Sequence, residues 1–286
     1  MGQGYGRVAL VSAGSRGIGA ATVARLAADS WDVSFCFSRD EQFAVEAEKA
    51  ASELGARVLA VQADVTEAAE VASWVRQAED LGPVGAVVSC AGISRDRPLA
   101  HLEDADWRAV TDTGLGGLFH LCQAALPAMM KRRSGRIVAV SSVSGVYGPA
   151  PGSPAGNRTA GNRAAGNRTA GNRTAGNTAA DSRAADSRAG VAEFTRALAN
   201  QTALYGIRVN ALVPAAVSAE EAAIWPEGTR AAVTEVVALR RFASAAAVAD
   251  RVAFLLSDAA DDLTGSVLEV AGGIETLPAA PSGICC

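Results

Sequence analysis

RVALVSAGSRGIGAATVARLAADSW, residues 7–31, joins an apolar run to a glycine-rich turn and then to an amphipathic segment. The run from Arg7 to Gly14 is typical of a strand buried on both faces of a parallel sheet. The residues after the turn place apolar side chains at helical spacing. Gly14, Gly17 and Gly19 allow the backbone to approach a phosphate and the helix to pack on the strand. The segment therefore predicts the phosphate-binding opening of a dinucleotide fold.

The rest of the chain alternates strands with helices. Further strands are expected at 32–40, 58–66, 86–92, 136–145, 207–217 and 265–273. Helices are expected at 41–55, 67–81, 106–133, 189–206 and 242–258. This alternation predicts an α/β protein with a Rossmann-type, doubly wound, seven-stranded parallel sheet. We expect a single domain over 1–276 and a flexible tail over 277–286.

Composition excludes several classes of function. The 286 residues carry a net charge of −4, so there is no electrostatic case for binding nucleic acid. No apolar run approaches a membrane span, and the first residues lack the apolar core of a signal peptide. We therefore expect a cytoplasmic protein. No metal site is expected, because the two histidines, His101 and His120, have no ligand partner at useful spacing.

The five cysteines show no zinc-type spacing either. Cys36, Cys90 and Cys122 lie in apolar segments and are interpreted as buried free thiols. Cys285 and Cys286 end the chain, where a terminal pair can also be a prenylation signal in eukaryotes.

The end of the second strand bears on the choice of cofactor. An NAD-specific site would place an acidic residue there to bind the ribose 2′-hydroxyl. Ser38 and Arg39 occupy this end, and Arg16 lies in the glycine-rich turn. Two cations near the 2′ position suit a phosphate, so NADP(H) is favoured over NAD(H). The alternative is that both arginines are solvated surface residues.

A low-complexity repeat interrupts the domain at 153–183. Pentapeptides of the type AGNRT run from residue 155 and drift to ADSRA by residue 188. Gly-Asn pairs every five residues oppose a continuous helix, so a solvated basic loop is expected. The last two units are alanine-rich and could extend the following helix backwards. The arginines could contact an acidic carrier protein or a partner subunit, but we favour sequence drift.

Several motifs occur together along the chain: SAGSRGIG, ADV, CAG, GRIVAVSS, YGIRVNALVP, RRF and LTGSVLEVAGG. With them the chain resembles the classical short-chain dehydrogenases/reductases, and among these the β-ketoacyl-[acyl-carrier-protein] reductases, from Arg7 to Gly273 apart from the repeat. The resemblance implies a nicotinamide cofactor along the carboxyl ends of the strands. It also implies dimers or tetramers through helices 106–133 and 189–205. The cofactor-binding residues that it indicates are Ser12, Gly14, Ser15, Arg16, Gly17, Ile18, Gly19, Ser38, Arg39, Asp64, Val65, Cys90, Ala91, Gly92, Arg188, Pro214 and Val217.

The resemblance fails in the catalytic set. Such enzymes use a Tyr as proton donor, a Lys four residues later, a Ser that binds the carbonyl oxygen and an Asn in the proton relay. Ser142 matches the Ser, but Gly114, Ala184 and Arg188 take the places of Asn, Tyr and Lys. Tyr147 is a candidate replacement acid, so the candidate catalytic residues are Ser142, Tyr147 and Arg188.

Positions around the cofactor also depart from the family pattern. Ala13 replaces the first glycine of the turn and adds one methyl group, and Ala215 replaces the glycine after Pro214. Cys90 stands where an Asn is usual.

Three functions follow from this pattern. The first is a catalytically degenerate subunit that assembles with an active NADP(H)-dependent reductase of the same fold, in the metabolism of carrier-bound acyl or polyketide-type chains. The second is an active NADPH-dependent carbonyl oxidoreductase with a rebuilt proton relay. The third is an NADP(H)-binding regulator without turnover. The expected partners are further copies of the chain, an active paralogue, or an acyl or peptidyl carrier protein.

Overall fold

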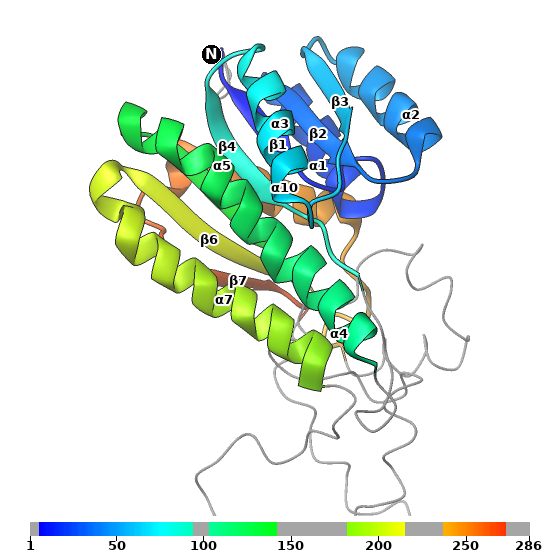
Figure 1. The fold of residues 1–286 in the computed structure, drawn as a ribbon, viewed down its shortest axis with the longest axis vertical. Coiled ribbons are helices and arrows are strands. Elements are labelled where there is room, and N and C mark those ends of the chain that lie inside the picture. Colours follow the sequence, from blue (N-terminus) through cyan, green and yellow to red (C-terminus); the bar gives the residue numbers. More distant parts are fainter. Residues whose placement is uncertain (1–5, 94–102, 142–181, 215–236, 273–286) are drawn as a thin grey trace, which may run out of the picture.

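A computed structural model describes residues 6–93, 103–141, 182–214 and 237–272, with side chains from residue 190 onward in the third range (Figure 1). Its sheet has the order β3-β2-β1-β4-β5-β6-β7, and every neighbouring pair is parallel. The predicted seven-stranded Rossmann-type sheet is therefore confirmed. The strands are β1 (Val8–Val11), β2 (Asp32–Phe37), β3 (Val58–Gln62), β4 (Val84–Ser89), β5 (Gly135–Val140), β6 (Ile207–Pro214) and β7 (Val267–Val270).

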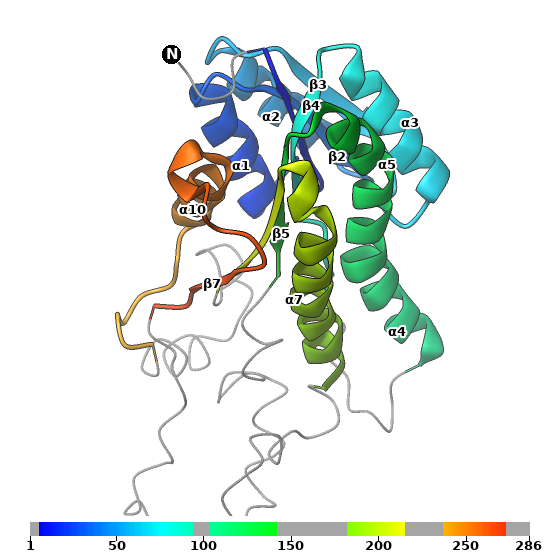
Figure 2. The same cartoon turned by 90° about the vertical axis from the view of Figure 1, so that its left-hand side faces the viewer.

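Helices cover both faces of this sheet, as Figure 2 shows. One face carries α1 (Gly17–Ala28), α2 (Glu41–Ser52) and α10 (Ala245–Leu256), which is followed by the short η6 (Asp258–Ala260). The other carries α3 (Ala68–Glu79), α5 (Gly117–Arg132) and α7 (Ser182–Thr202), which leads into η5 (Ala203–Tyr205). Preceding α5 on this face are α4 (Asp104–Thr111) and the π-helical turn η2 (Asp112–Gly116).

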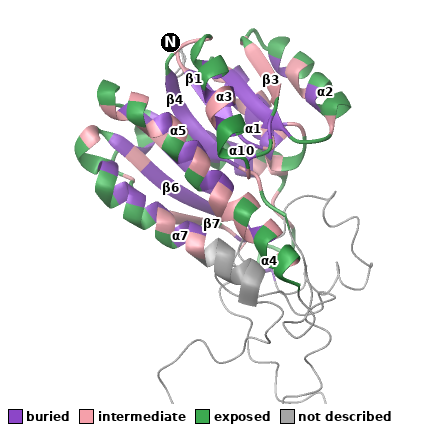
Figure 3. Ribbon diagram, viewed as in Figure 1, coloured by how far each residue is buried: buried purple, intermediate pink, exposed green. Residues whose placement is uncertain are grey.

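Each strand contributes side chains alternately to the two cores, because successive residues of a strand point to opposite faces. In β1, Val8 and Leu10 join the core under α3, α5 and α7, whereas Ala9 and Val11 join the core under α1 and α10. All four residues are fully buried, and burial is concentrated in the strands (Figure 3). This double burial explains why β1 reads as an uninterrupted apolar run.

Two buried polar side chains link α3 to the sheet. The indole N–H of Trp74 on α3 donates to the hydroxyl of Ser34 on β2 at 2.8 Å, and that hydroxyl donates to the carbonyl of Leu59 at 3.2 Å. These bonds tie α3 to the two strands at one side of the sheet.

Some element boundaries differ from the expected ones. The helix expected at 106–133 begins at Asp104 and widens into η2, where three glycines lie within residues 114–117 and weaken the regular helix. The helix expected to reach residue 55 ends at Ser52, and Gly55 has a φ of +91°. The fourth strand begins earlier, at Val84, and ends at Ser89.

The end of the repeat is helical, as the alanine-rich units predicted, because α7 begins at Ser182. Residues 142–181 lie outside the described part of the chain, so the form of the earlier repeat units stays a prediction. The tail at 277–286 lies outside it too.

Candidate cofactor-binding site

The carboxyl edge of the sheet gathers the predicted cofactor-binding segments. The glycine-rich turn follows β1, Ser38 and Arg39 follow β2, Asp64 and Val65 follow β3, and residues 90–92 follow β4. Because β1 lies between β2 and β4, the chain winds in opposite directions from this point. Ligands of doubly wound sheets bind at such a switch point.

The glycines of the turn serve two different needs. A Cβ atom at Gly14 would lie 2.4 Å from the Cβ of Phe35, and one at Gly19 would lie 2.0 Å from the carbonyl oxygen of Ala13. Gly14 therefore lets the turn pack against β2, and Gly19 lets α1 pack against the turn. Gly17 has a φ of +57° and no heavy atom within 4 Å of the Cβ position, so its backbone is open to a ligand.

The first turn of α1 fits an anionic group. No side chain of the described residues caps this helix at Arg16, and no acidic residue lies in its first turn. The unpaired N–H groups and the positive end of the helix dipole are suited to a phosphate. Together with the open backbone at Gly17, this geometry fits the pyrophosphate of a dinucleotide.

Ser12 fixes the turn to the end of β4. Its side chain is fully buried, and its hydroxyl oxygen accepts hydrogen bonds from the backbone N–H groups of Cys90 at 2.9 Å and Ala91 at 3.0 Å. The next residue, Ala13, adopts a left-handed conformation with a φ of +53°. A residue with a side chain is strained in this conformation, so alanine at this position costs backbone strain.

Arg16 lies at this edge, as predicted, but with a partner that the sequence interpretation did not include. Its guanidinium forms an ion pair with the carboxylate of Asp40. It also lies over the ring of Phe43, with the guanidinium carbon 5.1 Å from the ring centroid. Asp40 directly follows Ser38 and Arg39 in the sequence, and this adjacency was the available signal for its pairing with Arg16. Both Ser38 and Arg39 are exposed.

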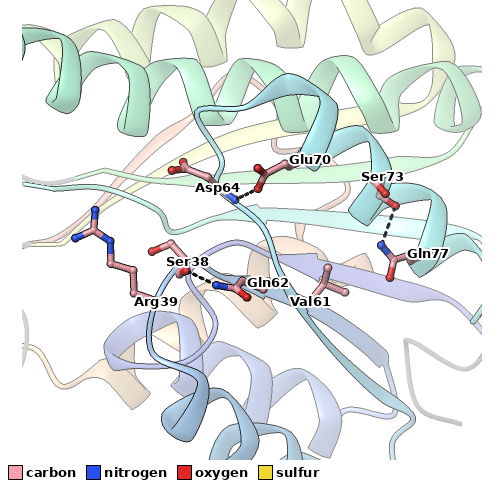
Figure 4. Close-up of a pocket in the computed structure, with 8 residues that line it drawn as sticks. All are labelled: Ser38, Arg39, Val61, Gln62, Asp64, Glu70, Ser73 and Gln77. Atoms are coloured by element: carbon pink, nitrogen blue, oxygen red, sulfur yellow. Dashed lines mark hydrogen bonds between the residues drawn. The ribbon is translucent and has the colours of Figure 1, made fainter.

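A pocket of about 490 Å³ extends from Ser38 and Arg39 across the end of β3 to α3 (Figure 4). Gln62 donates to the carbonyl of Ser38 at 3.0 Å, and the carboxylate of Glu70 accepts from the N–H of Asp64 at 2.8 Å. The residues that line the pocket are Ser38, Arg39, Val61, Gln62, Asp64, Glu70, Ser73 and Gln77. This polar pocket adjoins the segment where the ribose 2′ position is expected.

The Asp64–Val65 segment is held from both sides. The side chain of Asp64 accepts hydrogen bonds from the backbone and the hydroxyl of Thr66 at 2.9 and 2.8 Å. The Nδ1 atom of His120 lies 2.9 Å from the carbonyl oxygen of Val65, and a Cβ atom at Gly117 would lie 2.8 Å from Cγ2 of Val65. His120 thus makes a structural contact, whereas His101 lies outside the described residues.

The three described cysteines are weaker acids than a free thiol. Burial raises the pKa of Cys36, Cys90 and Cys122 to about 12 each, and all three are free. Cys36 and Cys122 are buried as predicted, while Cys90 retains some exposure. Cys285 and Cys286 lie outside the described residues.

The candidate catalytic positions among the described residues lie on helical segments that contact each other. Gly114 is part of η2, and no heavy atom lies within 4 Å of its Cβ position. Ala184 and Arg188 belong to α7, which approaches η2 so closely that a Cβ atom at Gly190 would lie 3.3 Å from Cδ2 of Leu115. Ser142, Tyr147 and Val217 lie outside the described residues.

The described ranges contain no group of three or more His, Cys, Asp or Glu side chains placed to hold a metal ion. None of their helices has both the length and the apolar character needed to cross a membrane.

Comparison with known proteins agrees with this architecture. A family model described as short chain dehydrogenase matches residues 7–154, and one described as Enoyl-(Acyl carrier protein) reductase matches residues 169–275. The 3-oxoacyl-[acyl-carrier-protein] reductase FabG of Escherichia coli is 32% identical over 270 residues, covering 94% of this chain and 97% of that protein.

Two other relatives give the same result. The FabG protein of Staphylococcus aureus is 30% identical over 267 residues, covering 93% of this chain and 97% of that protein. Nodulation protein G of Azospirillum brasilense is 31% identical over 270 residues, covering 94% and 98%. The chain therefore belongs to the classical short-chain dehydrogenase/reductase family.

Proposed function

We propose that this protein is an NADP(H)-binding, ketoreductase-like subunit that has lost its proton relay. It assembles with an active NADP(H)-dependent reductase of the same fold, and this assembly works in the cytoplasm on carrier-bound acyl or polyketide-type chains. One contrast carries the proposal. The cofactor edge keeps its turn, its uncapped helix and its arginines, whereas Gly114, Ala184 and Arg188 take the places of three catalytic side chains.

The retained cofactor-binding residues are suited to NADP(H). The N-terminus of α1 would hold the pyrophosphate, with the bonds from Ser12 to residues 90 and 91 fixing the turn below it. Arg16 and Arg39 would bind a ribose 2′-phosphate. When bound, the nicotinamide would supply the hydride for carbonyl reduction. The guanidinium of Arg188 would keep a positive charge at the lysine position.

None of the three replaced catalytic positions carries a side chain that can donate a proton. Gly114 and Ala184 have no ionisable group, and an arginine remains protonated at any working pH, so Arg188 cannot relay a proton. Loss of a general acid typically lowers a rate by about 10²- to 10⁴-fold. Cofactor binding without efficient turnover is the expected consequence.

Assembly would use the helices that family relatives are expected to pair. The helical face formed by α4, α5 and α7 remains intact, and large apolar side chains are exposed on it at Trp107 (40%) and Phe119 (46%). An active paralogue with the same face could therefore complete a dimer or tetramer. Without a paralogue, copies of this chain would form a homo-oligomer through the same face.

The test restores the missing groups together. We expect purified wild type to bind NADPH but to show no oxidation of it with a 3-oxoacyl thioester. The triple variant Gly114→Asn, Ala184→Tyr, Arg188→Lys should raise turnover at least about 10²-fold. The open space at Gly114 makes the first change sterically acceptable. The matched control carries Ala184→Phe in place of Ala184→Tyr and should remain inactive.

Two results would redirect the proposal. Turnover by the wild type that is lost on Ser142→Ala would favour the active oxidoreductase with a rebuilt relay. NADPH binding without co-purification of a second reductase, and without rescue in the triple variant, would favour the non-catalytic regulator.

A further inference from the structure

One ion pair joins two loops of the carboxyl edge. Arg16 ends the glycine-rich turn after β1, and its guanidinium pairs with Asp40, which precedes α2. The same guanidinium lies over the ring of Phe43 in the first turn of α2, 5.1 Å from the centroid. A carboxylate and an aromatic face from the second loop thus hold one cation of the first.

Asp40 pairs with Arg16 rather than capping its own helix. It occupies the N-cap position of α2, where aspartate is among the preferred residues because its oxygen can accept from the helix N–H groups. In this structure its side chain makes no capping hydrogen bond, and its φ and ψ are −100° and 72°. The carboxylate is directed to Arg16 instead.

The pair reduces the positive charge available at the edge. Asp40 compensates Arg16, whereas Arg39 forms no ion pair with any other described residue. The side chains of Arg16 and Asp40 are 59% and 40% exposed, so solvent and salt screen their attraction and a phosphate can displace the carboxylate. Asp40 would then remain beside a group of its own sign.

From this geometry we propose that Asp40 sets the strength of the preference for a 2′-phosphorylated cofactor. It lowers NADP(H) affinity by neutralising Arg16 before binding and by repelling the phosphate afterwards, while Phe43 keeps the guanidinium in place. This inference rests on the proposed function, in which NADP(H) binds at this edge. Asp40 is therefore a specificity-determining residue that acts through Arg16.

The experiment compares Asp40→Asn with wild type by calorimetry, using 2′-AMP, 5′-AMP, NADPH and NADH as ligands. We expect about fivefold tighter binding of 2′-AMP and NADPH, and less than about a twofold change for 5′-AMP and NADH. Asparagine is also a good N-cap, so α2 should remain folded, and a thermal melt checks this. Glu53→Gln, an equal charge change at the exposed far end of α2, should leave all four affinities unchanged.

A second variant locates the effect. Adding Arg16→Ala to Asp40→Asn should abolish the gain, because Asp40 acts through the Arg16 guanidinium. An unchanged ratio of NADPH to NADH affinity in Asp40→Asn, or an equal gain for both, would overturn the role of Asp40. If neither wild type nor Asp40→Asn binds either dinucleotide, the proposed function itself fails and this inference with it.

Discussion

The hydroxyl of Ser12 accepts a hydrogen bond from the backbone N–H of Cys90 at 2.9 Å, across the point where the sheet changes winding direction. It accepts a second bond from Ala91 at 3.0 Å. One buried side chain thus fixes the glycine-rich turn relative to the loop after β4. Both segments border the proposed cofactor site, so this link connects stability to binding.

Removing that acceptor should lower stability and cofactor affinity together. Ser12→Ala leaves two backbone donors without their partner, at a cost of about 2 kcal/mol in the free energy of unfolding. Urea unfolding and NADPH titration measure the two effects. Ser12→Thr keeps the oxygen and should lose clearly less stability. A Ser12→Ala variant as stable as wild type would show that water replaces the hydroxyl.

Ala13 is strained by its left-handed backbone, and glycine should relieve that strain. We expect Ala13→Gly to raise the free energy of unfolding by about 0.5–1 kcal/mol, net of the extra freedom that glycine brings to the unfolded chain. The control is Ala50→Gly on the exposed face of α2, which should destabilise by about 1 kcal/mol. Equal losses in both variants would contradict the strain.

Two glycines of the site should differ sharply in their tolerance of alanine. Gly19→Ala brings a methyl group within 2.0 Å of the carbonyl oxygen of Ala13, so we expect a loss of about 3 kcal/mol or more in thermal unfolding. Gly92→Ala meets no heavy atom within 4 Å and should change stability by no more than about 0.5 kcal/mol. Similar melting temperatures for the two variants would refute the close approach of α1 to the turn.

The buried thiols predict a loss of stability at alkaline pH. Burial raises the pKa of Cys122 from 9.0 to about 12, so the folded state keeps a proton that the unfolded state releases. This contribution is complete below pH 9 and is lost as the pH rises from 9 towards 12. Each such thiol contributes a slope of about 1.4 kcal/mol per pH unit.

The slope can be isolated by comparing wild type with Cys122→Ala. Urea unfolding at pH 8, 9.5 and 10.5 should show a shallower alkaline decline in the variant, whatever its stability at pH 8. Other titrating groups are common to both proteins and cancel in the difference. Parallel declines would mean that the Cys122 thiol ionises with an ordinary pKa in the folded state.

The sequence alone determined the fold class and the order of the elements. Local patterns were sufficient, because a strand buried on both faces must be apolar throughout and a helix on the sheet must carry one apolar side. Residues 7–31 therefore predicted β1, the turn and α1. The alanine-rich end of the repeat predicted the backward extension of α7. The absence of Tyr and Lys at positions 184 and 188 was equally visible.

Only the tertiary structure decided which groups from distant segments meet. Ser12 and Cys90 are 78 positions apart, and the pairing of Arg16 with Asp40 joins loops of different strands. The left-handed backbone of Ala13 lies where α1 packs against the turn, and local propensity, which disfavours such a backbone for alanine, did not indicate it. Contacts between segments depend on the three-dimensional path of the chain, and a linear pattern of residue types carries no record of that path.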